Sequence, residues 1–166
     1  MARFRPAYYC LILGATSLMA GDYDALLSAM KKAWPTVSTL AVVCDANASK
    51  AALSDLTGAS GGMKVMVLDV KGPQDMGKAI GALSARKPDA VVLLAGDRVA
   101  GDGSSAAGFL IQRMASLKVP TAAITEAGVK QGAALGIGSG TGGKLLSNAK
   151  VAAVAGVAVP AGATAL

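Results

Sequence analysis

Histidine is absent from this chain of 166 residues. Its absence excludes Ser-His-Asp and Cys-His catalysis, histidine-ligated metals and histidine-based pH switching. Cysteine is scarce as well: Cys10 and Cys44 lie in separate apolar runs without the spacing of zinc ligands, so we expect free buried thiols. The sequence therefore predicts no metal site, and we expect no cofactor.

Charged and aromatic residues are also few. Only 16% of the residues are charged and 4% are aromatic, whereas 53% are hydrophobic, a composition that excludes disorder. The formal net charge of +6 comes from scattered lysines and arginines. Nucleic-acid-binding domains gather such residues in a stripe, so we expect no nucleic-acid partner. The charge favours an anionic small ligand or simple solubility, and composition alone leaves both open.

No apolar run reaches the ~18–20 residues that a membrane-spanning helix needs, so we expect no membrane span. The run at 7–20, preceded by Arg3 and Arg5, loosely resembles a signal peptide. Two tyrosines and the polar residues at 16–17 interrupt that run, and we interpret it as a buried strand instead. The expected compartment follows the same choice: periplasmic if the segment is a signal, and cytoplasmic otherwise.

Short apolar runs alternate with amphipathic segments along the chain. Apolar, often β-branched runs predict strands, and apolar residues at helical spacing predict helices. Strands are expected at 8–13, 39–44, 64–70, 90–95, 121–124 and 133–137, and helices at 22–34, 49–56, 73–85, 104–117, 127–131 and near 143–149. This order predicts one doubly wound α/β domain over residues 1–150, with a mostly parallel sheet of about five to six strands and helices on both faces. An Ala/Val/Gly-rich tail follows at 151–166.

The residues that follow the predicted strands are the candidate binding residues, because ligands of such sheets bind at the carboxyl ends of the strands. Small hydroxyls, amides and acids gather there and suit a hydrogen-bonding pocket for a small polar molecule. The candidates are Thr16, Ser17, Asp45, Asn47, Asp97, Thr125 and Glu126. Each residue type also forms turns and helix caps, so a structural role is the alternative. No nucleophile stands beside an identifiable base, and no catalytic residue is predicted.

Two further patterns in the sequence are typical of anion binding. The stretch Gly138-Ser-Gly-Thr-Gly-Gly143-Lys144 nearly matches a phosphate-binding loop, but Leu145 stands where the motif needs Ser or Thr. A nucleotide triphosphatase is therefore not expected, and a plain anion nest or a glycine-rich turn is preferred. Arg98 follows Asp97 and could bind a carboxylate, or form a surface ion pair.

Four stretches of this sequence carry a family resemblance. They are Gly14-Ala-Thr-Ser17, then Trp34-Pro35 leading to Thr39 through Asp45-Ala-Asn47, then Lys87-Pro-Asp-Ala-Val-Val-Leu-Leu94, and finally Val119-Pro120-Thr121 through Glu126 to Ile137. Their order over residues 12–150 resembles ABC transporter substrate-binding proteins that take small organic solutes. The last stretch, with its Pro-strand-acid-x-x-Val-x-x-Gly-Ala pattern, is the most specific.

The resemblance implies half of a periplasmic-binding-protein fold and the capture of a small polar organic solute without chemistry, so the chain is not expected to be an enzyme. By position, it implies that the seven candidate binding residues named above contact the solute. Members of that family close two domains on the ligand, whereas this chain has about one. We therefore expect either a homodimer that rebuilds the cleft or a repurposed domain, with an ABC permease as partner if transport persists.

Two other interpretations stay open. The first is a flavodoxin-like or Rossmann-like enzyme or nucleotide-binding domain, although the turn at 14–17 lacks the G-x-G-x-x-G spacing. The second is a structural protein whose tail at 151–166 adds a strand to a neighbour's sheet.

Overall fold

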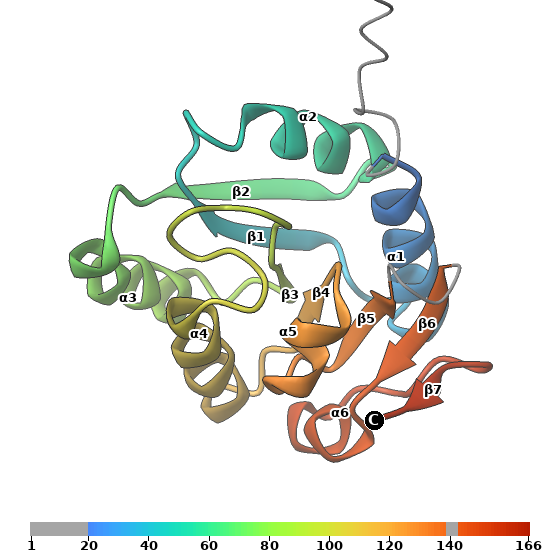
Figure 1. Ribbon diagram of the computed structural model, residues 1–166. Helices are drawn as coiled ribbons and strands as arrows, with labels where there is room; N and C mark the ends of the chain where they lie inside the picture. The colour runs from blue at the N-terminus through green and yellow to red at the C-terminus, as the bar shows by residue number, and fades with distance from the viewer. Residues whose placement is uncertain (1–19, 139–142) are drawn as a thin grey trace, which may run out of the picture.

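The computed structural model describes residues 20–138 and 143–166, which form a seven-stranded sheet with helices around it (Figure 1). The strands are β1 (Thr39–Cys44), β2 (Lys64–Asp69), β3 (Ala90–Val92), β4 (Thr121–Ala123), β5 (Leu135–Gly138), β6 (Lys144–Ser147) and β7 (Thr164–Ala165). The helices are α1 (Ala20–Ala33), α2 (Lys50–Ala59), α3 (Met76–Arg86), α4 (Ser105–Ser116), α5 (Glu126–Lys130) and α6 (Ala149–Ala155), with a 3₁₀ turn at Pro73–Asp75 before α3.

The sheet is mostly parallel, as expected for a doubly wound α/β domain. Its order is β2-β1-β3-β4-β5-β6-β7; β2 to β5 run parallel, β6 runs antiparallel to β5, and β7 runs parallel to β6. Within the described residues the sheet has seven strands, two more than the five predicted there, because β6 and β7 were not expected. The predicted strand at 8–13 lies outside the described residues.

The central strands are buried on both faces, which explains their continuous apolar sequences. Alternate residues of β1 face opposite layers: Leu40 and Val42 pack into one cluster, and Ala41 and Val43 into the other. Strand β1 has the predicted bounds. Strand β3 ends at Val92, although Leu93 and Leu94 continue the buried run.

Two helical layers cover the sheet (Figure 1). Helices α1 and α2 pack against each other on one face, where the predicted stripe of Tyr23, Leu26, Leu27 and Met30 is fully buried. Helices α3 and α4 cover the other face through residues that include Ile80, Leu83, Leu110 and Met114. The apolar periodicity in the sequence therefore marks the inner face of each helix correctly.

The helix predicted near 143–149 is wrong, because Lys144–Ser147 forms strand β6. Four residues of β6 pair with β5, and this pairing buries Leu146 and Ser147. Sheet pairing outweighs local propensity in such a short segment. The helix begins only at Ala149, after Asn148 accepts a hydrogen bond from the backbone N–H of Val151 at 3.2 Å.

The tail at 151–166 packs onto its own domain. It completes α6, then runs past α1, where the indole N–H of Trp34 donates to the carbonyl of Ala158 at 2.8 Å, and ends in β7 against β6. The tail thus joins the sheet of its own chain through β7, and the pairing of this edge strand with a neighbour's sheet stays a prediction. Of the helices in the described ranges, none is both long and apolar enough to cross a membrane.

Candidate functional site

The strand order reverses between β1 and β3, since the chain passes from β1 outward to β2 and then returns to the other side of β1. The carboxyl ends of β1 and β3 therefore form the topological switch point, where doubly wound sheets bind ligands. Asp45 follows β1 and Asp97 follows β3, and both are buried. No spacing in the sequence places these two acids together, but the backbone N–H of Asp45 donates to Oδ2 of Asp97 at 2.9 Å.

Both carboxylate oxygens of Asp97 accept hydrogen bonds, and these bonds hold two loops together. Its Oδ2 also accepts the hydroxyl of Ser49 at 2.6 Å, and its Oδ1 accepts the backbone N–H groups of Val99 and Ala100 at 2.9 and 2.8 Å. Ser49 therefore does not cap α2 with its side chain, although it stands at the N-cap position. No acid lies in the first turn of α2 either, so the positive end of that helix is not neutralised by its own residues.

Asp45 is the centre of an ion-pair cluster. Its Oδ1 accepts Lys71 Nζ at 2.9 Å, and its Oδ2 accepts Arg98 Nε at 2.7 Å and also contacts Nη2 of the same guanidinium. Lys71 Nζ also donates to Asp69 Oδ1 at 2.9 Å. Hydrogen bonds from Lys71 and Arg98 outweigh the effect of burial and hold the pKa of Asp45 well below its ordinary value. The backbone N–H of Asn47 adds a bond at 3.1 Å.

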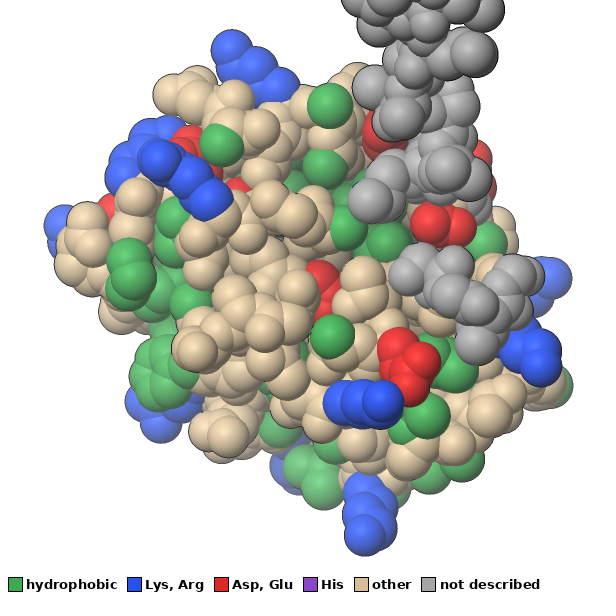
Figure 2. Space-filling model, in the orientation of Figure 1, with side chains coloured by type: hydrophobic (Ala, Val, Ile, Leu, Met, Phe, Trp, Pro, Cys, Tyr) green, Lys and Arg blue, Asp and Glu red, His purple; other side chains and the backbone are tan. Residues whose placement is uncertain are grey.

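The two cations of this cluster reach the surface, although the acid between them does not. The Arg98 side chain is 63% exposed and that of Lys71 is 45% exposed, against 3% for Asp45. Asp69, at the end of β2, is 49% exposed. Figure 2 shows basic and acidic side chains gathered at the upper left, over the region where β1 and β2 end in Figure 1.

A third acid, Asp102, connects the same loop to the end of β4. Its Oδ2 accepts the backbone N–H of Thr125 at 2.6 Å, directly before α5. Gly128 is required beside it, because a Cβ there would lie 2.1 Å from Asp102 Oδ1. Burial raises the pKa of Asp102 against the lowering effect of the Thr125 N–H. The loop at 96–104 is thus held to β1 by its first acid and to β4 by its second.

The structure brings together only part of the predicted set. Asp45, Asn47 and Asp97 meet at the switch point, with the Asn47 side chain exposed. Thr125 and Glu126 lie at the end of β4, and Glu126 pairs with Lys130 one turn along α5 at 2.7 Å. Thr16 and Ser17 lie outside the described residues.

Sequence reasoning missed Lys71 and Asp102. Lys71 lies two residues after β2, so the strand-end rule would have found it had it been applied to that strand as well. Asp102 is five residues beyond Asp97, and only its place between Gly101 and Gly103 hints at a special turn. No spacing in the sequence reveals its contact with Thr125.

The elements on either side of the glycine-rich stretch differ from those of a phosphate-binding loop. Such a loop connects a strand to the N-terminus of a helix, which supplies the anion site. Here Gly138 ends β5 and Lys144 begins β6, an antiparallel strand. The residues at 139–142 lie outside the described set. In the described ranges, no three cysteine or carboxylate side chains gather as a metal site, and Cys44 is a free buried thiol.

Two of the cavities among the described residues bear on the site. One of about 590 Å³ lies between α1 and residues 158–161 and is lined mostly by small apolar side chains. Another of about 400 Å³ lies beside the end of β2 and is lined in part by Asp69, Asp75 and Lys78. Asp75 accepts the backbone N–H of Lys71 at 2.9 Å, so this second cavity adjoins the ion-pair cluster.

Solved structures with the same arrangement of elements identify the fold. A conserved domain protein from Vibrio cholerae O1 biovar eltor str. N16961 matches with a TM-score of 0.72 and 20% identity, over 86% of this chain and 59% of its own. An ABC domain in complex with L-Trp from Streptococcus pneumonia matches with a TM-score of 0.71 and 18% identity, over 87% and 61%.

A third match is a ligand-free, open substrate-binding protein with adhesive properties from Clostridium difficile, with a TM-score of 0.70 and 16% identity over 85% of this chain and 58% of its own. The chain has a periplasmic-binding-protein-like fold. It spans about three-fifths of the length of these structures. No family model and no curated protein matches the sequence.

Proposed function

We propose that this chain binds a small polar organic solute at the carboxyl edge of its sheet and performs no chemistry on it. The observation that carries the proposal is the convergence of three strand-end loops, which bring Asp45, Lys71, Asp97 and Arg98 into one polar cluster at the switch point. This is the place where the fold binds ligands in general. Among the similar structures, one is a complex with L-Trp and one is a substrate-binding protein.

The chemistry of the cluster favours binding over catalysis. A general base needs a free lone pair within reach of substrate, and both oxygens of Asp45 and Asp97 already accept hydrogen bonds. We assign these two acids the role of holding the loops. The proposed direct contacts are the exposed Asn47 and the strand-end residues Thr125 and Glu126, together with Thr16 and Ser17.

A second surface is needed to enclose the solute, because the side chains of Arg98 and Lys71 at this edge are 63% and 45% exposed. We propose that a second copy of the chain supplies it, so that two facing edges form a cleft. Delivery to an ABC permease is the transport role that this proposal allows. The compartment depends on the segment at 7–20: periplasmic if it is a signal peptide, and cytoplasmic otherwise.

Thermal unfolding in the presence of a library of small organic solutes tests this proposal. At least one solute should raise the melting temperature, since a ligand that binds only the folded state stabilises it. Asn47→Ala should reduce that shift without changing the ligand-free melting temperature, because the Asn47 side chain is exposed. Gln112→Ala, an exposed amide on α4, is the matched control. If no solute shifts the transition, the proposal fails; a shift unaffected by Asn47→Ala would move the site away from this edge.

A further inference from the structure

We infer that the solute is an aliphatic organic anion whose carboxylate is bound by Arg98 and Lys71. This inference rests on the proposed function and names the ligand class for the same site. The basis is that the buried acids of the cluster already accept hydrogen bonds, whereas its two cations are exposed.

The buried acids offer nothing to a ligand. Asp97 accepts four hydrogen bonds and is 6% exposed. Asp45 accepts Lys71 and backbone N–H groups on Oδ1 and the guanidinium on Oδ2, at 2% exposure. An ammonium group on a solute would therefore have to break existing charge-assisted bonds to reach either carboxylate.

The cations, in contrast, keep free donors at the surface. A guanidinium has five N–H donors in a planar fork, and Arg98 directs its Nε and Nη2 toward Asp45. Its outer edge, on a side chain that is 63% exposed, is free to bind a carboxylate with two parallel hydrogen bonds. Lys71 uses two of its three donors, on Asp45 and Asp69. The buried Asp45 thus fixes both cations in place before a ligand arrives.

Asp69 and Asp75 are the acids beside these cations that are not buried, and each is tied to Lys71. Asp69 Oδ1 accepts Lys71 Nζ and the backbone N–H of Ala46, both at 2.9 Å. Asp75 Oδ2 accepts the backbone N–H of Lys71. Asp69 remains half exposed, so its charge opposes an approaching anion. Removing that charge should therefore strengthen anion binding, whereas it would weaken the binding of an amine.

The loops also indicate an aliphatic ligand. Residues 45–49, 69–71 and 96–104 contain no aromatic side chain, and Tyr23 and Trp34 are buried in the core. These three loops therefore offer no ring for stacking, and the exposed Phe109 lies beyond them on α4. Small mono- and dicarboxylates fit this surface better than an aromatic acid.

Isothermal titration with matched probes tests the inference. Carboxylates of two to six carbons are compared with the amides and amines of the same chain lengths, and with L-Trp. Carboxylates should bind, and Arg98→Gln should weaken them about tenfold or more, the loss expected for a charge-assisted hydrogen bond. Lys71→Gln should also weaken them, Arg98→Lys should retain part of the affinity, and Asp69→Asn should strengthen binding.

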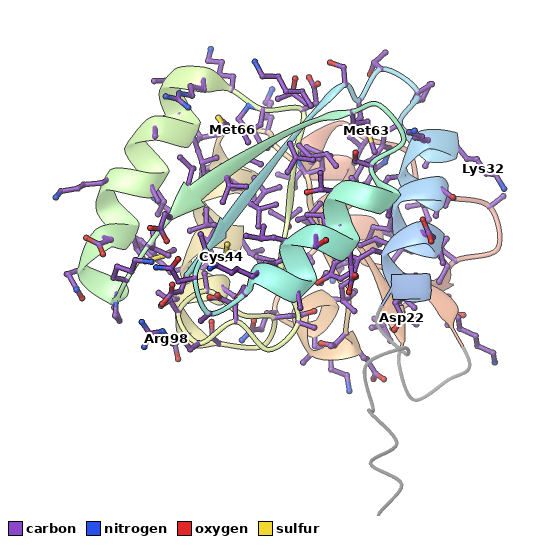
Figure 3. All side chains as sticks on the ribbon, turned by 90° about the horizontal axis from the view of Figure 1, so that it is seen from above. Asp22, Lys32, Cys44, Met63, Met66 and Arg98 are labelled. Atoms are coloured by element: carbon purple, nitrogen blue, oxygen red, sulfur yellow. The ribbon has the colours of Figure 1, made fainter. Side chains whose placement is uncertain are left out.

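Lys32→Gln is the control, because it removes the same charge from α1, on the opposite side of the molecule from Arg98 (Figure 3). Melting temperatures of all variants establish that they fold. If the amides, the amines or L-Trp bind and the aliphatic carboxylates do not, this inference is overturned and the proposed function still stands. Equal effects of Lys32→Gln and Arg98→Gln would also overturn it. If none of the probes binds, and the solute library gives no thermal shift, both proposals fail.

Discussion

At the scale of single residues, the acids at the carboxyl ends of the strands mainly hold neighbouring loops together through hydrogen bonds. Asp97 accepts four hydrogen bonds, two from the loop after β1 and two from its own loop. The ligand contact that the position of these acids suggested stays a prediction, and their observed hydrogen bonds support our proposal that they hold the loops instead. The groups that remain available are the cations that those acids orient.

Replacing Asp97 tests this structural role. Asp97→Ala leaves the Ser49 hydroxyl and three backbone N–H groups without their acceptor in a buried place. We expect the free energy of unfolding to fall by about 3 kcal/mol, since each unsatisfied buried donor costs about 1–3 kcal/mol and some will find water. Urea denaturation measures the change. Asp24→Ala, at an exposed position on α1, is the control, and equal losses for the two variants would contradict the assigned role.

Asp45 gives the domain a defined response to acid. Its pKa is lowered on folding, so its ion pairs stabilise the domain above the ordinary carboxyl pKa of about 4, and this stability is lost as the pH falls below that value. We expect the melting temperature to fall between about pH 5 and pH 2, and to fall less in Asp45→Asn. Circular dichroism melts across this range provide the measurement. Parallel pH profiles for the two proteins would show that Asp45 does not contribute.

At the scale of elements, two serines that precede helices have different roles despite similar sequence contexts. Ser104 caps α4, since its hydroxyl accepts the backbone N–H of Ala107 at 3.0 Å, whereas Ser49 before α2 donates to Asp97. Ser104→Ala should therefore lower the free energy of unfolding by about 1 kcal/mol, the usual worth of such a cap. Chemical denaturation tests this, with Ser105→Ala as the neighbouring control. Equal stability of Ser104→Ala and wild type would contradict the capping role of Ser104.

The elements that the sequence predicted well are those whose burial is uniform along their length. Strand β1 is buried from Leu40 to Cys44, and its apolar run has the same limits. In α1 the spacing of buried residues repeats with the helical period over the whole helix. Local pattern is sufficient in these cases because each residue faces the same layer as its periodic neighbours.

The elements that could not be predicted from the sequence depend on partners that are distant in the chain. Lys144–Ser147 is too short to show a period, and only pairing with β5 makes it a strand. The same reason applies to the site. The contacts of Asp97 with Asp45 and of Asp102 with Thr125 join residues on different strand-end loops, so they become visible only once the order of the sheet is known. Lys71 could have been predicted as a strand-end residue, but not its bonds to Asp45.

At the scale of the whole molecule, a periplasmic-binding-protein-like sheet presents one polar edge. The loops after β1, β2 and β3 meet there, and the buried acids between them fix two exposed cations. The chain spans about three-fifths of the length of similar structures, and both cations are exposed at this edge. Our account is that this edge holds a small organic anion, and that a second copy of the chain covers it.

Native mass spectrometry of the freshly purified chain tests this central claim most directly. Under gentle conditions, and after incubation with the carboxylate panel, we expect a small molecule bound to the chain and released on denaturation. A complex with the mass of two chains and a bound anion would support the rebuilt cleft as well. A bare chain under all of these conditions would contradict the claim, and the residues of the edge would then be structural only.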